Sequence, residues 1–144
     1  MVDDSTMKFG FVCVQNAGRS QMSTAFAERE RDRRDLENSV EIITGGTHPA
    51  DSVHEEVVTV MSELDIDLSD RKPREVSTAE LESCDVVATM GCSTLELDAE
   101  DVDIRDWALD DPDGEDLDQV RTIRDDIEQR VTDLFDELET RLVK

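Results

Sequence analysis

The sequence predicts an α/β protein in which helices cover both faces of a parallel β-sheet. Short apolar runs of strand length recur along the chain, and amphipathic helical patterns stand between them. Strands that alternate with helices pair in parallel through right-handed crossovers, so few topologies remain. A length of 144 residues with 37% hydrophobic content is enough for one domain with its own core, which we expect to span residues 1–144.

The first half of the chain alternates between strands and helices. Residues 9–14 are an apolar run that predicts the first strand, and Ser20 is expected to cap a helix that ends before Asn38. Residues 40–43 predict a second strand, which the glycine pair at 45–46 should end. The next predicted helix follows a proline and has the apolar residues Val53, Val57, Val60, Met61 and Leu64.

The second half continues the alternation. Residues 77–80 have the capping-box pattern of a short helix, residues 85–90 predict a third strand, and residues 104–107 a short fourth one. A long amphipathic helix is expected at the C-terminal end, because apolar residues there step by three and four. These residues are Leu117, Val120, Ile123, Ile127, Val131, Leu134, Leu138 and Leu142.

The junction between the first strand and the first helix has the composition of an oxyanion-binding loop. Ala17 and Gly18 allow a tight turn, and a turn at a helix start directs several backbone N–H groups and the helix dipole at one spot. Cys13 begins this loop, and Arg19, whose guanidinium suits bidentate contact with an oxyanion, ends it. The same N–H groups stabilise a thiolate, so Cys13 is a candidate nucleophile.

The Cys-x5-Arg spacing by itself is better explained by a small hydrophobe at the end of a buried strand and a solvated arginine. The pattern has only two fixed positions, and such short motifs need structural context. Here a strand is predicted before the loop and a helix after it, and this context favours the oxyanion-binding interpretation.

Residues 13–22, CVQNAGRSQM, resemble the active-site loop of the low-molecular-weight protein tyrosine phosphatase superfamily, and in particular of its arsenate reductase branch. Residues 43–49, 85–92 and 106–112 resemble further segments of that branch in the same order. The resemblance covers nearly the whole chain, and it implies a doubly wound fold of four parallel strands with helices on both faces.

The resemblance also implies roles for individual residues. The Cys13 thiolate would attack phosphorus or arsenic in line, and Asp111, restricted to extended geometry by Pro112, would protonate the leaving oxygen as general acid. Asn16 would brace the loop, and the Ser20 hydroxyl would donate to the thiolate. The oxyanion would be bound by Val14, Gln15, Asn16, Ala17, Gly18, Arg19 and Ser20.

Two enzymatic functions differ in the fate of the Cys13 adduct. Water would release phosphate, as in a phosphatase, whereas a second thiol would release arsenite and leave a disulfide, as in a reductase. Asp113 stands after Pro112, where the phosphatases usually have an aromatic residue, and the chain has no tyrosine. Cys92 matches the reductase position of the attacking thiol. Arsenate reductase is therefore the preferred function, and phosphate ester hydrolysis is the alternative.

The further cysteine that some reductases have downstream is absent, because Glu96 stands about where it would be. Either Cys92 or an outside thiol would then resolve the adduct, and the outside reductant would be thioredoxin, glutaredoxin or a small-molecule thiol. A third alternative is a non-enzymatic oxyanion-binding module that uses its negative charge to meet a basic partner.

Charge and composition exclude several partners. Thirty-eight acidic residues against fifteen basic ones give a net charge of −23, which repels nucleic acid and anionic membranes. The acidic excess is spread along the chain and favours a solvated surface adapted to high salt. No apolar run approaches the roughly 20 residues of a membrane span, and the acidic N-terminus is unlike a signal peptide. A cytoplasmic protein is expected.

Three cysteines and two histidines do not predict a metal or disulfide framework. No Cys-x2-Cys pair is present, and His48 and His54 are not accompanied by clustered thiols. We therefore expect no metal and no bound cofactor, and a structural role for Cys84.

Overall fold

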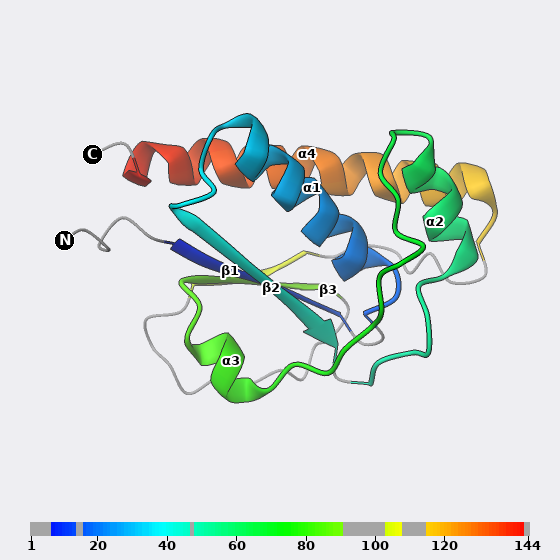
Figure 1. Cartoon of the computed structure of the whole chain (residues 1–144), viewed down its shortest axis with the longest axis horizontal. Helices are drawn as coiled ribbons and strands as arrows, with labels where there is room; N and C mark the ends of the chain where they lie inside the picture. Colours follow the sequence, from blue (N-terminus) through cyan, green and yellow to red (C-terminus); the bar gives the residue numbers. More distant parts are fainter. Residues whose placement is uncertain (1–6, 14–15, 47, 91–102, 108–114, 143–144) are drawn as a thin grey trace.

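The computed structural model describes residues 7–13, 16–46, 48–90, 103–107 and 115–142. Its elements in chain order are β1 (Met7–Cys13), α1 (Arg19–Arg33), β2 (Val40–Gly46), α2 (Glu55–Ser62), α3 (Thr78–Glu82), β3 (Val86–Met90), β4 (Asp103–Asp106) and α4 (Leu117–Leu142) (Figure 1). Each predicted helix and strand has its counterpart, which confirms the α/β class.

The four strands form one parallel sheet in the order β2-β1-β3-β4. This order confirms the doubly wound topology. β1 is paired on both sides, and its last residue, Cys13, lies opposite Gly46 of β2 and Met90 of β3. The carboxyl ends of three strands therefore meet around Cys13, at the edge of the sheet where open α/β folds bind their ligands.

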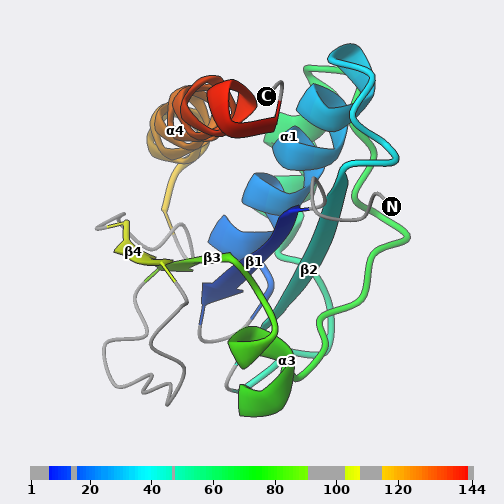
Figure 2. The ribbon, with the colours of Figure 1, turned by 90° about the vertical axis from the view of Figure 1, so that its left-hand side faces the viewer.

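Helices cover both faces of the sheet, as predicted. α1, α2 and α4 lie on one side and α3 on the other (Figures 1 and 2). Side chains along β1 alternate between these faces. Phe9, Phe11 and Cys13 belong to the larger core under α1, α2 and α4, whereas Val12 packs with Leu81 in a smaller cluster beside α3. The Cys13 side chain thus faces α1.

β2 is longer than predicted, because it continues through Gly45 and Gly46. The expectation that these glycines end the strand is wrong. Instead, the segment around Arg74 and Val76 approaches the strand closely. The N–H of Gly46 donates to the Arg74 carbonyl at 2.9 Å, and a Cβ atom on Gly45 would lie only 2.4 Å from Cβ of Val76. The absence of a side chain at Gly45 therefore permits this close backbone approach.

Ion pairs connect α2 to α4. Glu63, directly after α2, accepts hydrogen bonds from Arg121 and Arg124, each at 2.8 Å, and Arg124 also donates to the carbonyl oxygen of Val60 at 2.9 Å. The hydrogen bond from Arg121, followed by that from Arg124, lowers the pKa of Glu63 to about 2. A charged carboxylate is thus part of this helix contact.

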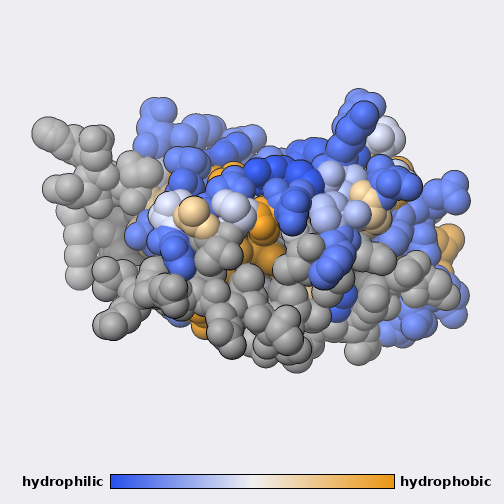
Figure 3. Space-filling model, turned by 90° about the horizontal axis from the view of Figure 1, so that it is seen from below, coloured by the Kyte–Doolittle hydropathy of each residue, from blue (hydrophilic) through white to orange (hydrophobic). Residues whose placement is uncertain are grey.

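The described surface is mostly hydrophilic on the side shown in Figure 3, with a small apolar area near its centre. In the part of the chain that the structure describes, no helix is both long and apolar enough to cross a membrane.

Candidate active site

The Cys13 sulfur lies at the carboxyl end of β1. The side chain is only 2% exposed. Its Sγ is 2.9 Å from Oγ of Ser20 and 3.2 Å from the backbone nitrogen of Asn16, which donates to it. The structure thus brings together the predicted nucleophile, its predicted hydroxyl partner and a backbone donor of the loop.

Asn16 adopts a left-handed backbone conformation, with a φ of 53°. Asparagine tolerates this region better than most residues other than glycine. Because the chain turns back at this position, the Asn16 N–H is directed at the sulfur of Cys13, three residues earlier. The predicted bracing residue therefore contacts the nucleophile directly.

The buried side chain of Asn16 makes a full set of four hydrogen bonds. Its Nδ2 donates to Oγ of Ser20 at 2.7 Å and to Oγ1 of Thr44 at 3.0 Å. Its Oδ1 accepts from the backbone N–H of Arg74 at 3.0 Å and from Nε2 of Gln21 at 3.1 Å. Asn16 therefore joins α1, β2 and the segment before α3.

These bonds determine where the Ser20 hydroxyl points. The backbone N–H of Arg74 can only donate, so the side-chain oxygen of Asn16 must face it and Nδ2 must face Ser20. Ser20 Oγ accepts that bond, and its own proton is left for the Cys13 sulfur. Two donors, one hydroxyl and one N–H, can therefore stabilise negative charge on the sulfur.

The expectation that Ser20 caps α1 is wrong. The helix begins at Arg19, and its cap residue is Gly18, without a side-chain cap bond. A capping hydroxyl would bond the free N–H groups of its own helix. Ser20 instead lies inside the first turn, where its hydroxyl meets Cys13. A shift of two residues thus changes the chemical role of this side chain.

The remaining described loop residues lie between the end of β1 and the start of α1. Arg19 is the first residue of the helix and is 9% exposed, and Ala17 is fully buried. The Ala17 carbonyl accepts from the N–H of His54 at 3.0 Å, which ties the loop to the start of α2. Four predicted site residues lie outside the residues that the structure describes: Val14, Gln15, Cys92 and Asp111.

Three members of the network were not predicted as site residues. Gln21 and Thr44 both bond the Asn16 side chain, and each stands in a segment that resembles the superfamily, so a sequence signal existed for both. Arg74 contributes its backbone N–H, and the identity of its side chain therefore could not have indicated this contact. Its guanidinium bonds the Thr44 carbonyl at 2.7 Å and Glu80 at 2.8 Å.

Cys84 lies on the opposite face of the sheet from Cys13. It is buried in the cluster that contains Val12 and Leu81, and its Sγ bonds only the carbonyl oxygen of Glu80, at 3.6 Å, among the contacts described. Burial raises its pKa to about 11. This environment agrees with the expected structural role.

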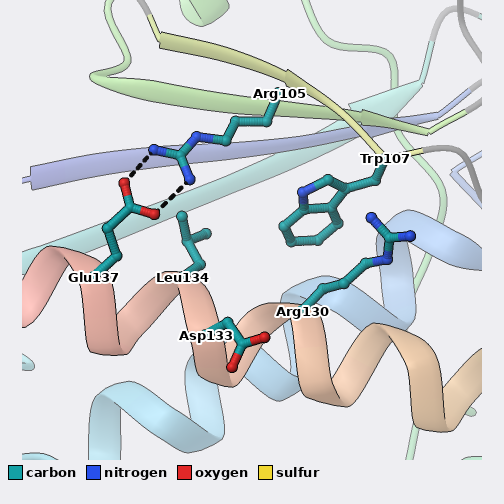
Figure 4. A pocket seen from close by; sticks show the side chains of 6 residues that line it. All are labelled: Arg105, Trp107, Arg130, Asp133, Leu134 and Glu137. Carbon is teal, nitrogen blue, oxygen red and sulfur yellow. Dashed lines mark hydrogen bonds and ion pairs between the residues drawn. The ribbon is translucent and has the colours of Figure 1, made fainter.

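A hollow of about 160 Å³ lies between the β4 region and α4, away from Cys13 (Figure 4). Three of its four charged groups are in ion pairs, and the fourth, Asp133, accepts a hydrogen bond from Gln129 at 2.9 Å. Arg105 donates to both carboxylate oxygens of Glu137 and to Asp103, and Arg130 donates to Asp126. The hollow is therefore a salt-bridged seam between two elements. Within the described ranges, no group of three or more possible metal ligands occurs.

Comparison with known proteins places this geometry in a family. The family described as low molecular weight phosphotyrosine protein phosphatase matches residues 8–144. A protein of Halobacterium salinarum, provisionally named an arsenate reductase, is 82% identical over 137 residues, which cover 95% of this chain and 96% of that protein. The glutaredoxin arsenate reductase of Synechocystis is 31% identical over 132 residues, covering 89% and 95%.

A solved structure of an arsenate reductase is also similar to this chain. The thioredoxin-dependent arsenate reductase of Corynebacterium glutamicum matches with a TM-score of 0.80 and 28% sequence identity. The match covers 97% of this chain and 65% of that chain, so this chain spans just under two thirds of the length of that enzyme.

Proposed function

The chain belongs to the low molecular weight phosphotyrosine protein phosphatase family, and from this premise we propose that it is a thiol-dependent arsenate reductase. The observation that supports the proposal most is the buried Cys13 sulfur with two donors, Ser20 and the Asn16 N–H, at the start of α1. The 82% identity to a protein provisionally named an arsenate reductase supports the choice of substrate.

The reaction begins with in-line attack of the Cys13 thiolate on the arsenic of arsenate. A sulfur–arsenic bond forms, and one arsenate oxygen leaves as water after protonation by Asp111. Arg19 and the loop amides stabilise the charge on the remaining oxygens. A second thiolate then attacks the Cys13 sulfur. The sulfur–arsenic bond breaks, its electron pair reduces arsenic from the +5 to the +3 state, and arsenite leaves behind a disulfide.

Cys92 is our candidate for the second thiol. Met90 is the Cα partner of Cys13 across the two parallel strands, and such neighbours lie about 4.8 Å apart. Cys92 follows Met90 by two residues, which span at most about 7 Å. A disulfide needs the two Cα atoms within about 7 Å, so a turn after Met90 is enough to form it. Ser23 donates to Sδ of Met90 at 3.3 Å and anchors this strand end against α1.

Asp111 is our candidate for the general acid. The N–H of Trp107 donates to the Thr89 carbonyl at 2.8 Å. The ring centroid of Trp107 is 6.0 Å from that of Phe11. These contacts hold Trp107, directly after β4, at the same edge of the sheet as Cys13. Asp111 follows four residues later, within about 14 Å of chain. This placement supports a role for its carboxyl group near the arsenate oxygens.

The disulfide must be reduced before the next turnover, so the enzyme needs an external thiol donor. Relatives are named for glutaredoxin and for thioredoxin, which makes these two donors the first to compare with a small-molecule thiol such as glutathione.

The proposal is tested by measuring arsenite formed from arsenate with each donor, for the wild type and for Cys13→Ser. We expect arsenite from the wild type with at least one donor and none from Cys13→Ser, while arsenate still binds to the variant. Turnover by Cys13→Ser, or no arsenite from the wild type with any donor, would contradict the proposal.

Phosphate ester hydrolysis is the second candidate function. The family match favours it, and the described part of the site contains what that reaction shares with arsenate reduction, namely the nucleophile and its donors. Hydrolysis of p-nitrophenyl phosphate without any arsenate reduction would select this function. Binding of both oxyanions without turnover of either substrate would leave an oxyanion-binding module.

A further inference from the structure

We propose that Gln21 is a positioning residue for the Cys13 nucleophile and that it acts through Asn16. The inference rests on the proposed function, because it takes Cys13 as the nucleophile. Gln21 is the third residue of α1 and is 2% exposed. Its Nε2 donates at 3.1 Å both to the backbone carbonyl oxygen and to the side-chain Oδ1 of Asn16.

The amide of Gln21 can have only one orientation. Both oxygens of Asn16 that it meets are acceptors, so the NH2 end must face them. Oε1 then points elsewhere, and within the part of the chain that the structure describes it is buried without a hydrogen-bond partner. An unpaired buried acceptor destabilises the folded state. An apolar side chain of similar length would avoid this cost, so the contribution of Gln21 must come from its two bonds to Asn16.

Those two bonds hold the residue that prepares the sulfur. Asn16 has its left-handed φ of 53°, its N–H donates to Cys13 Sγ, and its Nδ2 donates to Ser20. Gln21 fixes the backbone carbonyl and the side chain of Asn16 at once. Without this clamp, Asn16 can relax toward a commoner conformation, and both donors to the sulfur then lose their alignment.

The expected loss is in the chemical step. Arg19, which is predicted to bind the oxyanion, receives no side-chain bond from Gln21 in the described contacts. Binding of inorganic phosphate should therefore weaken less than kcat falls, because Arg19 keeps its place while only the part of the loop around Asn16 relaxes. Loss of one positioning hydrogen bond should lower kcat roughly tenfold.

The first variant to measure is Gln21→Met, which has nearly the same length and no amide. Gln129→Met is the matched control, because Gln129 is exposed on α4 and bonds Asp133 at 2.9 Å. For Gln21→Met we expect a roughly tenfold lower kcat, a smaller loss of phosphate binding and a melting temperature close to that of the wild type. A kcat within twofold of the wild type, or a loss matched by the control, would overturn the proposal.

A second variant, Gln21→Glu, keeps the shape and replaces the donor with an acceptor. Its carboxylate would face the two oxygens of Asn16 and be repelled by them. The loss in kcat should therefore exceed that of Gln21→Met, although glutamate is closer than methionine in shape to glutamine. Wild-type kcat in Gln21→Glu would overturn the proposal. Unfolding of both variants would assign Gln21 to the fold alone and overturn it as well.

One readout separates this inference from the proposed function. The rate at which iodoacetamide alkylates Cys13 reports on the sulfur and needs no turnover. If the wild type turns over no substrate, the proposed function fails, and alkylation still tests Gln21. Slower alkylation of Cys13 in Gln21→Met than in the wild type is expected, and an equal rate would overturn the inference.

Discussion

The Ser20 hydroxyl accepts a hydrogen bond from Asn16 and lies 2.9 Å from the Cys13 sulfur, so its proton is available to stabilise a thiolate. We expect Ser20→Ala to slow the attack on substrate roughly tenfold, as for the loss of one hydrogen bond to a charged group. The measurement is kcat with p-nitrophenyl phosphate or arsenate.

Thr24→Ala is the matched control for this prediction. Thr24 is buried on the same helix, and its hydroxyl bonds only the backbone carbonyl of Ser20, at 2.7 Å, among the contacts described. Its removal should leave kcat within about twofold of the wild type. Equal losses in the two variants would show that the helix, and not the bond to sulfur, causes the effect.

Cys84 should be inert in the folded protein. Burial raises its pKa to about 11, so at pH 8 only about one thiol in a thousand is ionised. We expect iodoacetamide at pH 8 to label Cys13 in the native protein and to label Cys84 only after unfolding. Labelling of Cys84 should increase as pH rises toward 11. Peptide mass spectrometry measures both sites, and native labelling of Cys84 as fast as Cys13 would contradict this account.

Only some residues of the site could be predicted from the sequence. The strand-loop-helix pattern predicted Cys13 as the nucleophile, whereas the roles of Asn16 and Ser20 beside it were implied by the resemblance of residues 13–22 to the superfamily's active-site loop. Thr44 and Arg74 reach Asn16 from 28 and 58 residues away. Thr44 stands in a segment that resembles the superfamily, but its contact with Asn16 and that of Arg74 depend on the pairing of β2 with β1, which no local pattern indicates.

The contact between α2 and α4 depends on a charged carboxylate and should weaken in acid. The pKa of Glu63 is lowered from 4.5 to about 2, first by the hydrogen bond from Arg121 and then by that from Arg124. A lowered pKa means stabilisation that is fully present above pH 4.5 and is lost as the pH falls through about 2. We therefore expect Glu63→Gln to lower the melting temperature at neutral pH.

The difference in stability between the wild type and Glu63→Gln should shrink between pH 4.5 and about 2. Glu37→Gln is the control, because Glu37 is exposed and has no described ion pair. Chemical denaturation at several pH values at low salt measures the difference. A difference that is independent of pH, or one shared by the control, would remove the charge of Glu63 as the cause.

Element types were largely predictable, whereas several element boundaries were not, and the end of β2 and the start of α1 are the clearest cases. Apolar periodicity placed the helices and strands, and parallel pairing followed from their alternation. The glycine pair predicted a break after residue 43, yet pairing with β1 and the approach of Val76 extend β2 to Gly46. Serine is a common helix-cap residue, but the loop geometry places Gly18, and not Ser20, at the cap position of α1. Tertiary contacts decided both cases.

The whole molecule has a net charge of −23, and its described surface is mostly hydrophilic on the side seen in Figure 3. Repulsion between carboxylates should destabilise the fold at low ionic strength. The Debye length falls from about 10 Å at 0.1 M salt to about 3 Å at 1 M. We expect the melting temperature to rise by several degrees across this range of KCl, and most of the rise to be complete near 1 M.

Sucrose is the control for this salt series, because it stabilises proteins by exclusion from the surface without screening charge. A melting temperature that does not respond to KCl would leave the acidic excess without a role in salt adaptation and would favour a basic partner for this surface.

Two thiols are required for the proposed reduction, and the direct measurement is to trap them after reaction. The wild type is mixed with arsenate at limiting thiol, quenched with iodoacetamide and mapped by peptide mass spectrometry, with phosphate in place of arsenate as the control. We expect a Cys13–Cys92 disulfide that depends on arsenate, and loss of arsenate reduction but not of ester hydrolysis in Cys92→Ser. Cys13 found alkylated and never oxidised, with arsenite still formed, would contradict its role as the nucleophile.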